Sequence, residues 1–325
     1  WVNTIFEDYL YITIRTIIVY CTSILFTFIL VHNKNDYYLY AVLTVGTTGF
    51  VSLLNWIHCR KKCSIRIRVS KETPKHIKPI LVFFANKVAV SLYVSSDTTM
   101  LGIMTNDYRV GIYSASVKIY TIIKNMLAAI YAVCIPRLSS KMGKNDDVGF
   151  KQLYSEIVSI MTLLIFPAAI GLFLLSPNII LLLFGSEYVD SSISLKILSF
   201  AIIFAIYGGV VSAVFNTTRN LEKVSLEATI FSALINVGFN IILIPKFQEK
   251  GAAFTTVVAE AITFIYCFFK AKNIKDYLDF RMIKKCLMEA LVGGIEIVAI
   301  VVSCHNLFSN NLVCIMVAIG CSVVM

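Results

Sequence analysis

The chain has 325 residues, of which 58% are hydrophobic and only 15% are charged, and its mean hydropathy is +0.80. Soluble globular proteins are about 45–50% apolar and about 25% charged, so a single water-facing core could not bury this excess. The composition therefore excludes an ordinary soluble protein and predicts that lipid surrounds most of the chain. The net charge of +10 is spread between the apolar runs and does not form the basic face that nucleic acid binding requires, so no nucleic acid partner is expected.

Apolar windows of about 20 residues predict ten membrane-spanning helices. In chain order, we expect them at 10–31, 37–57, 79–104, 110–136, 153–175, 192–216, 225–246, 251–270, 285–303 and 311–325. Helices are favoured over barrel strands because the runs lack a period of two. The sequence opens at Trp1 and stops at Met325 inside an apolar run, which is typical of a fragment.

The basic residues alternate between the two sides of the predicted membrane. One set of alternate connections carries 20 of the 29 lysines and arginines, and the intervening set carries 4. The positive-inside rule places the rich set in the cytoplasm. Its longest member, 58–78, contains eight basic residues and Pro74 and is predicted to link two helical bundles. A second basic connection, 270–285, precedes the last two helices.

Several charged residues fall inside the predicted helices. Arg15 and Lys196 lie near helix ends, where a long side chain can extend to the membrane surface. Lys87, Lys124 and Glu260 lie deeper, where a charge costs about 2.5–3.5 kcal/mol on insertion scales. Such residues are expected to face the interior of a bundle or a hydrated cavity.

Polar residues repeat at helical spacing on four of the helices. The four stripes are Asn86, Tyr93 and Asp97; Ser114, Lys118 and Asn125; Thr229, Ser232, Asn236 and Asn240; and Thr256, Glu260 and Thr263. Hydrogen bonds between helices would account for the asparagines. They account poorly for the lysines, because packing does not need a charge.

Depth suggests one specific pair. Asp97 lies seven residues before the outer end of its helix, and Lys118 lies eight residues after the start of the next helix. Adjacent antiparallel helices would bring both to about 11–12 Å from the outer boundary, which predicts an ion pair. The pair would serve as a structural link or as a gate or proton-sensitive switch, and both alternatives stay open.

Lys87 and Lys124 have no obvious partner in the sequence. A cavity with surplus positive charge favours a substrate that carries phosphate, because ammonium groups contact phosphate oxygens directly.

An ordered series of short motifs resembles the O-antigen flippases, the Wzx-type polysaccharide exporters of the MATE-like MOP superfamily. The stretch from Pro79 through Asn86-Lys87 to Tyr93 and Asp97–Gly102 resembles the first helix of their second bundle. Further similar stretches follow in the same order: Val110–Lys118, Pro136-Arg137-Leu138, Leu183–Tyr188, Asn236–Asn240, Ile244-Pro245 and Gly251-Ala252-Ala253.

The resemblance implies an all-α membrane protein with two six-helix bundles and alternating access. On that basis 1–57 would hold the last two helices of the first bundle and 58–78 the cytoplasmic linker. The second bundle would be 79–270, and 271–325 would add a linker and an extra, truncated helix pair. About four helices of an intact member would precede this sequence, and the fragment alone is not expected to transport.

The resemblance also implies the substrate and its partners. The protein would flip an undecaprenyl-pyrophosphate-linked oligosaccharide, an O-antigen or capsule unit, from the cytoplasmic to the periplasmic leaflet of the bacterial inner membrane. A polysaccharide polymerase and a chain-length regulator would be its partners, and no cofactor or metal is expected.

The candidate site has three groups of residues. Lys87, Lys118 and Lys124 would form a cationic cavity that attracts the pyrophosphate, and Asp97 and Glu260 would act in gating or coupling. Asn86, Tyr93, Ser114, Asn125, Asn236 and Asn240 would give the cavity a polar lining for the sugar.

Two other functions are weighed against this one. A cation-coupled drug antiporter on the same scaffold would need carboxylates to dominate the cavity. A membrane enzyme would need a sizeable water-exposed loop with catalytic groups, and neither such a loop nor a GxxxxGK[ST] or HExxH motif is found in the sequence. The sequence therefore predicts a transporter and not an enzyme.

Overall fold

The computed structural model describes residues 8–33, 36–62 and 96–307, and the description below is confined to them. The chain divides into two compact units, 1–78 and 79–325, and each is described by itself. In this described part the regular structure is entirely helical, and seven helices are long and apolar enough to cross a membrane. The predicted all-α membrane fold is confirmed.

The first unit contains two long helices, α2 (Tyr9–Leu30) and α3 (Tyr37–Lys62), which pack together. The turn between them is closed by Asp36, whose carboxylate accepts the backbone N–H groups of Asn33 at 2.8 Å and His32 at 3.0 Å. These two hydrogen bonds, the one from Asn33 first, lower the pKa of Asp36. The turn is therefore stabilised by an ionised carboxylate.

Arg15, which the sequence placed near a helix end, is held between the two helices of the first unit. It is 8% exposed, and its Nη1 donates a hydrogen bond to the side-chain oxygen of Asn55 on α3. The sequence could not show this partner, because Asn55 lies 40 residues away on another helix.

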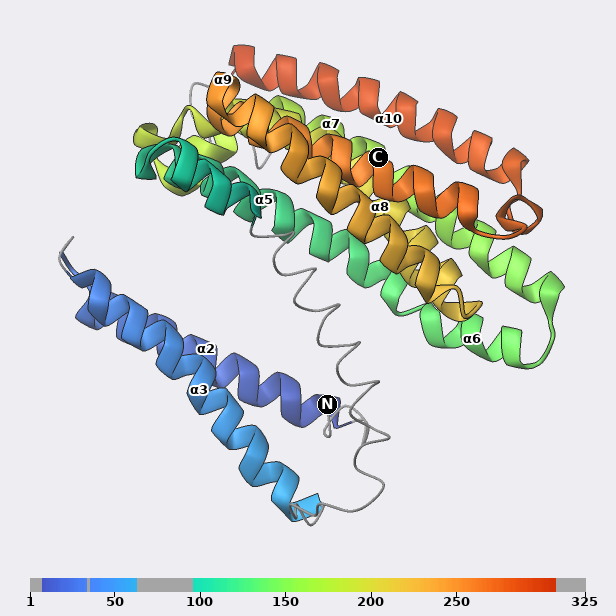
Figure 1. Ribbon diagram of the computed structural model, residues 1–325, viewed down its shortest axis with the longest axis horizontal. Coiled ribbons are helices and arrows are strands. Elements are labelled where there is room, and N and C mark those ends of the chain that lie inside the picture. Colours follow the sequence, from blue (N-terminus) through green and yellow to red (C-terminus); the bar gives the residue numbers. More distant parts are fainter. Residues whose placement is uncertain (1–7, 34–35, 63–95, 308–325) are drawn as a thin grey trace. The chain divides into compact units, whose positions relative to one another are not determined.

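The second unit begins, in its described part, with a helical segment at 96–104 and continues through six α-helical elements (Figure 1). They are α5 (Asp107–Ala132), α6 (Ile135–Gly143), α7 (Asp147–Phe184), α8 (Ser191–Gly209), α9 (Glu222–Lys270) and α10 (Phe280–Leu307). Short 3₁₀ helices occur at η2 (Ser186–Tyr188) and η4 (Ile274–Tyr277), and α8 continues as a π-helix, η3 (Val210–Asn216).

The element α9 is a hairpin of two helices. Gln248 has φ 53° and ψ −130°, which breaks the helix between the two arms. Ser232 in the first arm donates to the carbonyl of Ala259 in the second at 2.7 Å, so the arms lie side by side. The two arms match the helices predicted at 225–246 and 251–270. The predicted helix at 79–104 is described only from residue 96, and the one at 311–325 lies outside the described residues.

The helix α7 is longer than predicted, since it spans 147–184 and not 153–175. Its start is set by Asp146, whose side chain accepts the Gly149 backbone N–H at 2.8 Å. That bond and a second one from Lys141 lower the pKa of Asp146. At its other end α7 continues past Pro177 to Gly185, whose φ of +85° ends the helix.

The centre of the second unit is α8, which packs against α5, α7 and α9. Small residues allow the close approach to α5: Ser116 donates to the Ser191 carbonyl at 2.7 Å, and Ser191 donates to the Ile112 carbonyl at 2.8 Å. The helix α10 lies along α7 (Figure 1), where a Cβ on Gly294 would come within 2.4 Å of Ile170.

Contacts between helix ends show which connections share a side of the second unit. At one end Arg109 lies 3.1 Å from Glu249 and 3.9 Å from Asp190, so the starts of α5, α8 and the second arm of α9 meet there. At the other end the guanidinium of Arg219 lies 4.5 Å from the ring centre of Tyr277. This grouping agrees with the alternation of basic and non-basic connections. Which end faces the cytoplasm stays a prediction.

Candidate functional site

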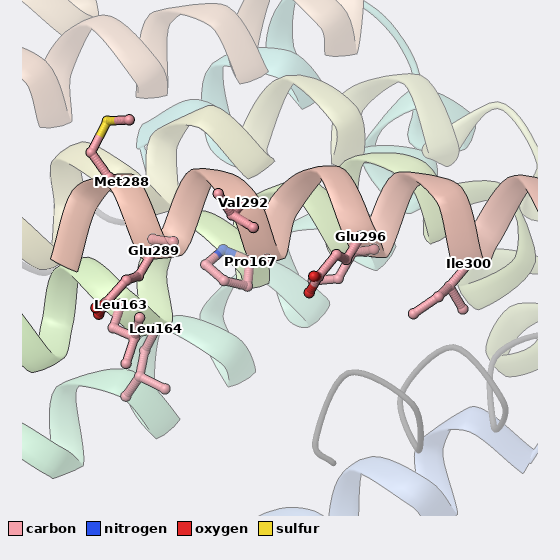
Figure 2. A pocket seen from close by; sticks show the side chains of 11 residues that line it. Leu163, Leu164, Pro167, Met288, Glu289, Val292, Glu296 and Ile300 are labelled. Atoms are coloured by element: carbon pink, nitrogen blue, oxygen red, sulfur yellow. The ribbon is translucent and has the colours of Figure 1, made fainter. Parts of the chain in front are cut away.

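Cavities in the described part of the second unit differ in chemistry, and two of them bear on the site. The larger, about 690 Å³, lies between α7 and α10 and is lined mainly by apolar side chains. Figure 2 shows Glu289 and Glu296 projecting from the same side of α10 toward it. None of the residues that the sequence predicted for the site lines it. The smaller cavity, about 220 Å³, is therefore the candidate site.

The smaller cavity is lined by charged and hydroxyl-bearing side chains between the 96–104 segment, α5, α8 and the second arm of α9. Its lining residues are Asp97, Thr98, Tyr113, Val117, Tyr120, Thr121, Lys124, Asn125, Leu198, Thr256 and Glu260. Asp97, Asn125, Lys124 and Glu260 were predicted for the site and are brought together here.

Asp97 is the centre of the first polar cluster in this cavity. It is 8% exposed, and its carboxylate accepts Asn240 Nδ2 at 2.7 Å, Thr256 Oγ1 at 2.7 Å and Tyr113 Oη at 3.1 Å. Three donors from two elements therefore replace the water that the carboxylate loses on burial.

Two further hydrogen bonds, to an amide and from a hydroxyl group, fix the orientation of Asn240. Its Nδ2 also donates to Asn236 Oδ1 at 3.1 Å, and its own Oδ1 accepts Thr255 Oγ1 at 2.5 Å. Asn236, Asn240 and Thr255 are all at most 1% exposed. Asn240 thus bonds directly to Asp97 and Asn236 bonds to Asn240, and neither asparagine lines the cavity.

Glu260 is the centre of the second cluster. It pairs with Lys124 Nζ and accepts a hydrogen bond from Tyr120 Oη at 3.0 Å. The Glu260 side chain is 13% exposed and that of Lys124 is 34% exposed. Glu260 also lies one helical turn after Thr256, so the two clusters face the same cavity at neighbouring depths.

The site follows a seam between two parallel helices, α5 and the second arm of α9. Contacts run in the same direction on both: Arg109 meets Glu249, Tyr113 meets Thr256 at 3.1 Å, and Tyr120 meets Glu260. On α5 these residues are four and seven positions apart, which keeps them on one face of the helix.

The predicted ion pair between Asp97 and Lys118 is wrong. Both residues belong to the described part of the chain, and Asp97 is instead surrounded by neutral donors, whereas Lys118 is exposed. The prediction considered only depth and not the rotation of each helix about its axis. Tyr113, and not Lys118, is the α5 residue that faces Asp97.

The sequence suggested that Lys124 has no partner, and this was also wrong, because Glu260 pairs with it. Within this cavity two carboxylates therefore face one lysine, so its lining is not cationic. Lys118 and Ser114 are exposed and do not line it. The remaining predicted residues, Asn86, Lys87 and Tyr93, lie outside the described residues, and the proposed roles of all of them stay predictions.

The sequence-based prediction missed several contributors to the site, among them Tyr113, Tyr120 and Thr255. The two tyrosines are seven residues apart, a spacing that places both on one face of α5, and this signal could have identified them. No signal identified Thr255, whose contact with Asn240 depends on the hairpin of α9. In the parts of the chain that the structure describes, no cluster of three or more His, Cys, Asp or Glu side chains could hold a metal ion.

Comparison with known proteins identifies relatives in glycan assembly. The chain is 24% identical over 253 residues to the "Probable low-salt glycan biosynthesis flippase Agl15" of Haloferax volcanii, which covers 75% of this chain and 52% of the relative. It is 26% identical over 250 residues to the "Capsular polysaccharide biosynthesis protein CapF" of Staphylococcus aureus, covering 75% and 61%. The chain thus spans about half to three fifths of the length of these relatives.

Two further comparisons concern lipid II flippases. The chain is 22% identical over 187 residues to the "Lipid II flippase MurJ" of Bacillus subtilis, covering 56% of this chain and 34% of that protein. The fold matches a solved structure of "Lipid II flippase MurJ, inward closed conformation" with a TM-score of 0.75. That match has 17% sequence identity and covers 99% of this chain and 68% of the other.

The model of the "Lipid II flippase MurJ" family matches residues 7–321, nearly the whole chain. The predicted resemblance to flippases of the MOP superfamily is therefore confirmed at the level of the family, and the narrower likeness to the Wzx type stays a prediction. The chain belongs to the MurJ family of lipid II flippases.

Proposed function

We propose that the protein flips a polyprenyl-pyrophosphate-linked saccharide across a bacterial inner membrane, from the cytoplasmic to the periplasmic leaflet. The observation that supports this best is a charged cavity between membrane-spanning helices, in a chain that belongs to a flippase family. A charge inside a membrane protein is costly and by default marks a substrate or ion pathway.

The substrate would be an O-antigen or capsule unit carried on undecaprenyl pyrophosphate. Relatives named for glycan and capsular polysaccharide biosynthesis support a saccharide of this class. Lys124, which lines the cavity, and Lys87 and Lys118, which are proposed from the sequence, would attract the pyrophosphate, because ammonium groups form charge-assisted hydrogen bonds with phosphate oxygens. A polysaccharide polymerase and a chain-length regulator would act on the same lipid-linked product.

Asp97 and Glu260 would act in gating or coupling. Both carboxylates face the cavity. Asp97 is bonded to Tyr113 on α5 and to Thr256 on the second arm of α9, and Glu260, on that arm, is bonded to Tyr120 on α5. A change in the bonding of either carboxylate would therefore move two helices relative to each other. In this proposal 79–270 forms the second bundle of an alternating-access transporter, and 1–57 belongs to the first.

Complementation tests the proposed function. The full-length protein is expressed in a strain that lacks its own flippase, and the surface polysaccharide is measured. We expect the wild type to restore the polysaccharide and the triple variant Lys87→Gln, Lys118→Gln and Lys124→Gln to fail at equal membrane abundance. Normal polysaccharide with all three lysines removed would contradict their assigned role.

One observation favours a second function. The cavity holds two carboxylates and one lysine, which is the balance expected of a cation-coupled antiporter for organic cations. Efflux of a fluorescent organic cation from cells that express the full-length protein separates the two functions. Efflux that depends on Asp97 and Glu260, without rescue of surface polysaccharide, would support the antiporter.

A further inference from the structure

The two members of the Lys124–Glu260 pair differ in how firmly they are held. Glu260 is 13% exposed and is bonded to both Lys124 and Tyr120, whereas the Lys124 side chain is 34% exposed and lines the same cavity. A lysine is a compact point charge on a flexible four-carbon stem. Lys124 is therefore the member that can turn to another anion while Glu260 stays in place.

Any anion that enters the cavity must compete with Glu260 for this lysine. Within the described residues that line the cavity, Lys124 is the one cationic side chain, and the other charged group, Asp97, is a carboxylate that would repel an anion. Asp97 is already bonded to three neutral donors, so it does not draw Lys124 away from Glu260. Lys124 and Glu260 thus form a two-position switch for one ammonium group.

We propose that Glu260 is an internal counter-anion, which the phosphate of the substrate displaces from Lys124 and which takes Lys124 back when the substrate leaves. This inference rests on the proposed function, because it assumes an anionic substrate. No covalent bond changes. One ammonium–carboxylate contact is exchanged for one ammonium–phosphate contact, and Glu260 keeps the hydrogen bond from Tyr120.

The physical benefit is in substrate release. A transporter must bind its substrate firmly enough to capture it and weakly enough to let it go, and tight binding in every state would slow turnover. Glu260 lowers the affinity of the loaded state because the lysine always has a second partner nearby. Removing Glu260 should therefore tighten binding and slow transport, which is the opposite of what the loss of a binding residue does.

A double-mutant cycle on the full-length protein in detergent tests this exchange. The probe is undecaprenyl diphosphate without sugar, and its dissociation constant is measured by microscale thermophoresis. We expect Glu260→Gln to tighten binding about three- to tenfold, a change of about 1 kcal/mol. Lys124→Gln should weaken binding at least as much, and the double variant should equal Lys124→Gln, because Glu260 acts only through the lysine.

Transport gives the second measurement. In proteoliposomes that contain the full-length protein, Glu260→Gln should lower the rate of flipping of the lipid-linked saccharide by tenfold or more despite its tighter binding. Weaker or unchanged binding by Glu260→Gln would overturn the inference, as would the same tightening in the Lys124→Gln background. If Glu260→Gln does not elute as a folded protein, Glu260→Asp is expected to shift binding in the same direction by a smaller factor.

Glu227→Gln is the matched control. Glu227 lies on the same element, α9, and also accepts a tyrosine hydrogen bond, from Tyr266 at 3.1 Å, but it is exposed and lines neither cavity described here. Its removal should leave probe binding unchanged. A wild-type protein that binds no diphosphate lipid would overturn both the proposed function and this inference, whereas wild-type binding with additive variants would overturn the inference alone.

Discussion

At the scale of single residues, the site depends on how each buried polar group is satisfied. Asp97 has only neutral partners, each a donor from a hydroxyl or an amide, whereas Glu260 has a lysine. The two carboxylates therefore respond differently to a change in the cavity. Asp97 belongs to a buried hydrogen-bonded network, and Glu260 belongs to the pair that we propose to open.

Removal of Asp97 should destabilise the second unit. Asp97→Ala would remove the acceptor that Asn240, Thr256 and Tyr113 share, and each buried donor left unsatisfied by its loss costs about 1–3 kcal/mol. We expect a lower midpoint of thermal unfolding for the full-length protein in detergent, measured by fluorescence-detected size exclusion.

The exposed residue Asp276 serves as the control for that measurement, since Asp276→Ala should leave the midpoint unchanged. Asp97→Asn, which keeps one acceptor oxygen, should fall between the wild type and Asp97→Ala. Equal midpoints for Asp97→Ala and the wild type would show that the network does not hold these helices together.

At the scale of elements, the hairpin of α9 brings the site together. Its first arm carries Asn236 and Asn240, and its second arm carries Thr255, Thr256 and Glu260. The turn at Gln248 is what lets residues that are 15 positions apart, such as Asn240 and Thr255, form a hydrogen bond. The stripes predicted on two separate helices become one surface only after this turn has formed.

Gly251 tests how tightly the hairpin is closed. A Cβ at this position would lie 2.6 Å from the backbone carbonyl oxygen of Leu243, and a backbone atom cannot move aside as a side chain can. Gly251→Ala should therefore force the arms apart, lower the midpoint of thermal unfolding and reduce complementation.

Gly238→Ala on the first arm is the matched control for the hairpin. A Cβ there meets no atom within 4 Å, and alanine is favoured over glycine in a helix by about 1 kcal/mol. Its midpoint should be equal to or above that of the wild type. If the Gly251→Ala and Gly238→Ala proteins have equal midpoints of thermal unfolding, the two arms are not as close as described.

At the scale of the whole molecule, the chain combines a small two-helix unit with a larger unit built around α8. The connections predicted for one side of the membrane are rich in lysine and arginine, and those predicted for the other are not. Contacts such as Arg109 with Glu249 and Arg219 with Tyr277 gather the helix ends of the second unit into two groups that agree with this division.

Cysteine labelling in intact cells tests which group faces outward. The native cysteines of the full-length protein, nine of which lie in this sequence, are first replaced. In that background Glu187→Cys should react with a membrane-impermeant maleimide. Asn145→Cys should react only after the membrane is permeabilised, because the connection around it is basic and is predicted to be cytoplasmic. The reverse pattern would invert the predicted orientation of every helix.

The sequence by itself determined the medium, the secondary structure and the order of the helices. Apolar runs of about 20 residues leave the backbone no alternative to helices in lipid, so composition and window length were sufficient. The polar residues within the apolar runs could also be read from the sequence, and four of those predicted for the site, Asp97, Lys124, Asn125 and Glu260, line one cavity.

Only the tertiary structure decided which of these residues meet. The rotation of each helix about its axis and the packing of α5 against the second arm of α9 are set by the fit of side chains across the whole unit, which no local pattern records. For this reason the sequence paired Asp97 with Lys118 and left Lys124 alone, whereas the packed helices turn Tyr113 toward Asp97 and Lys124 toward Glu260.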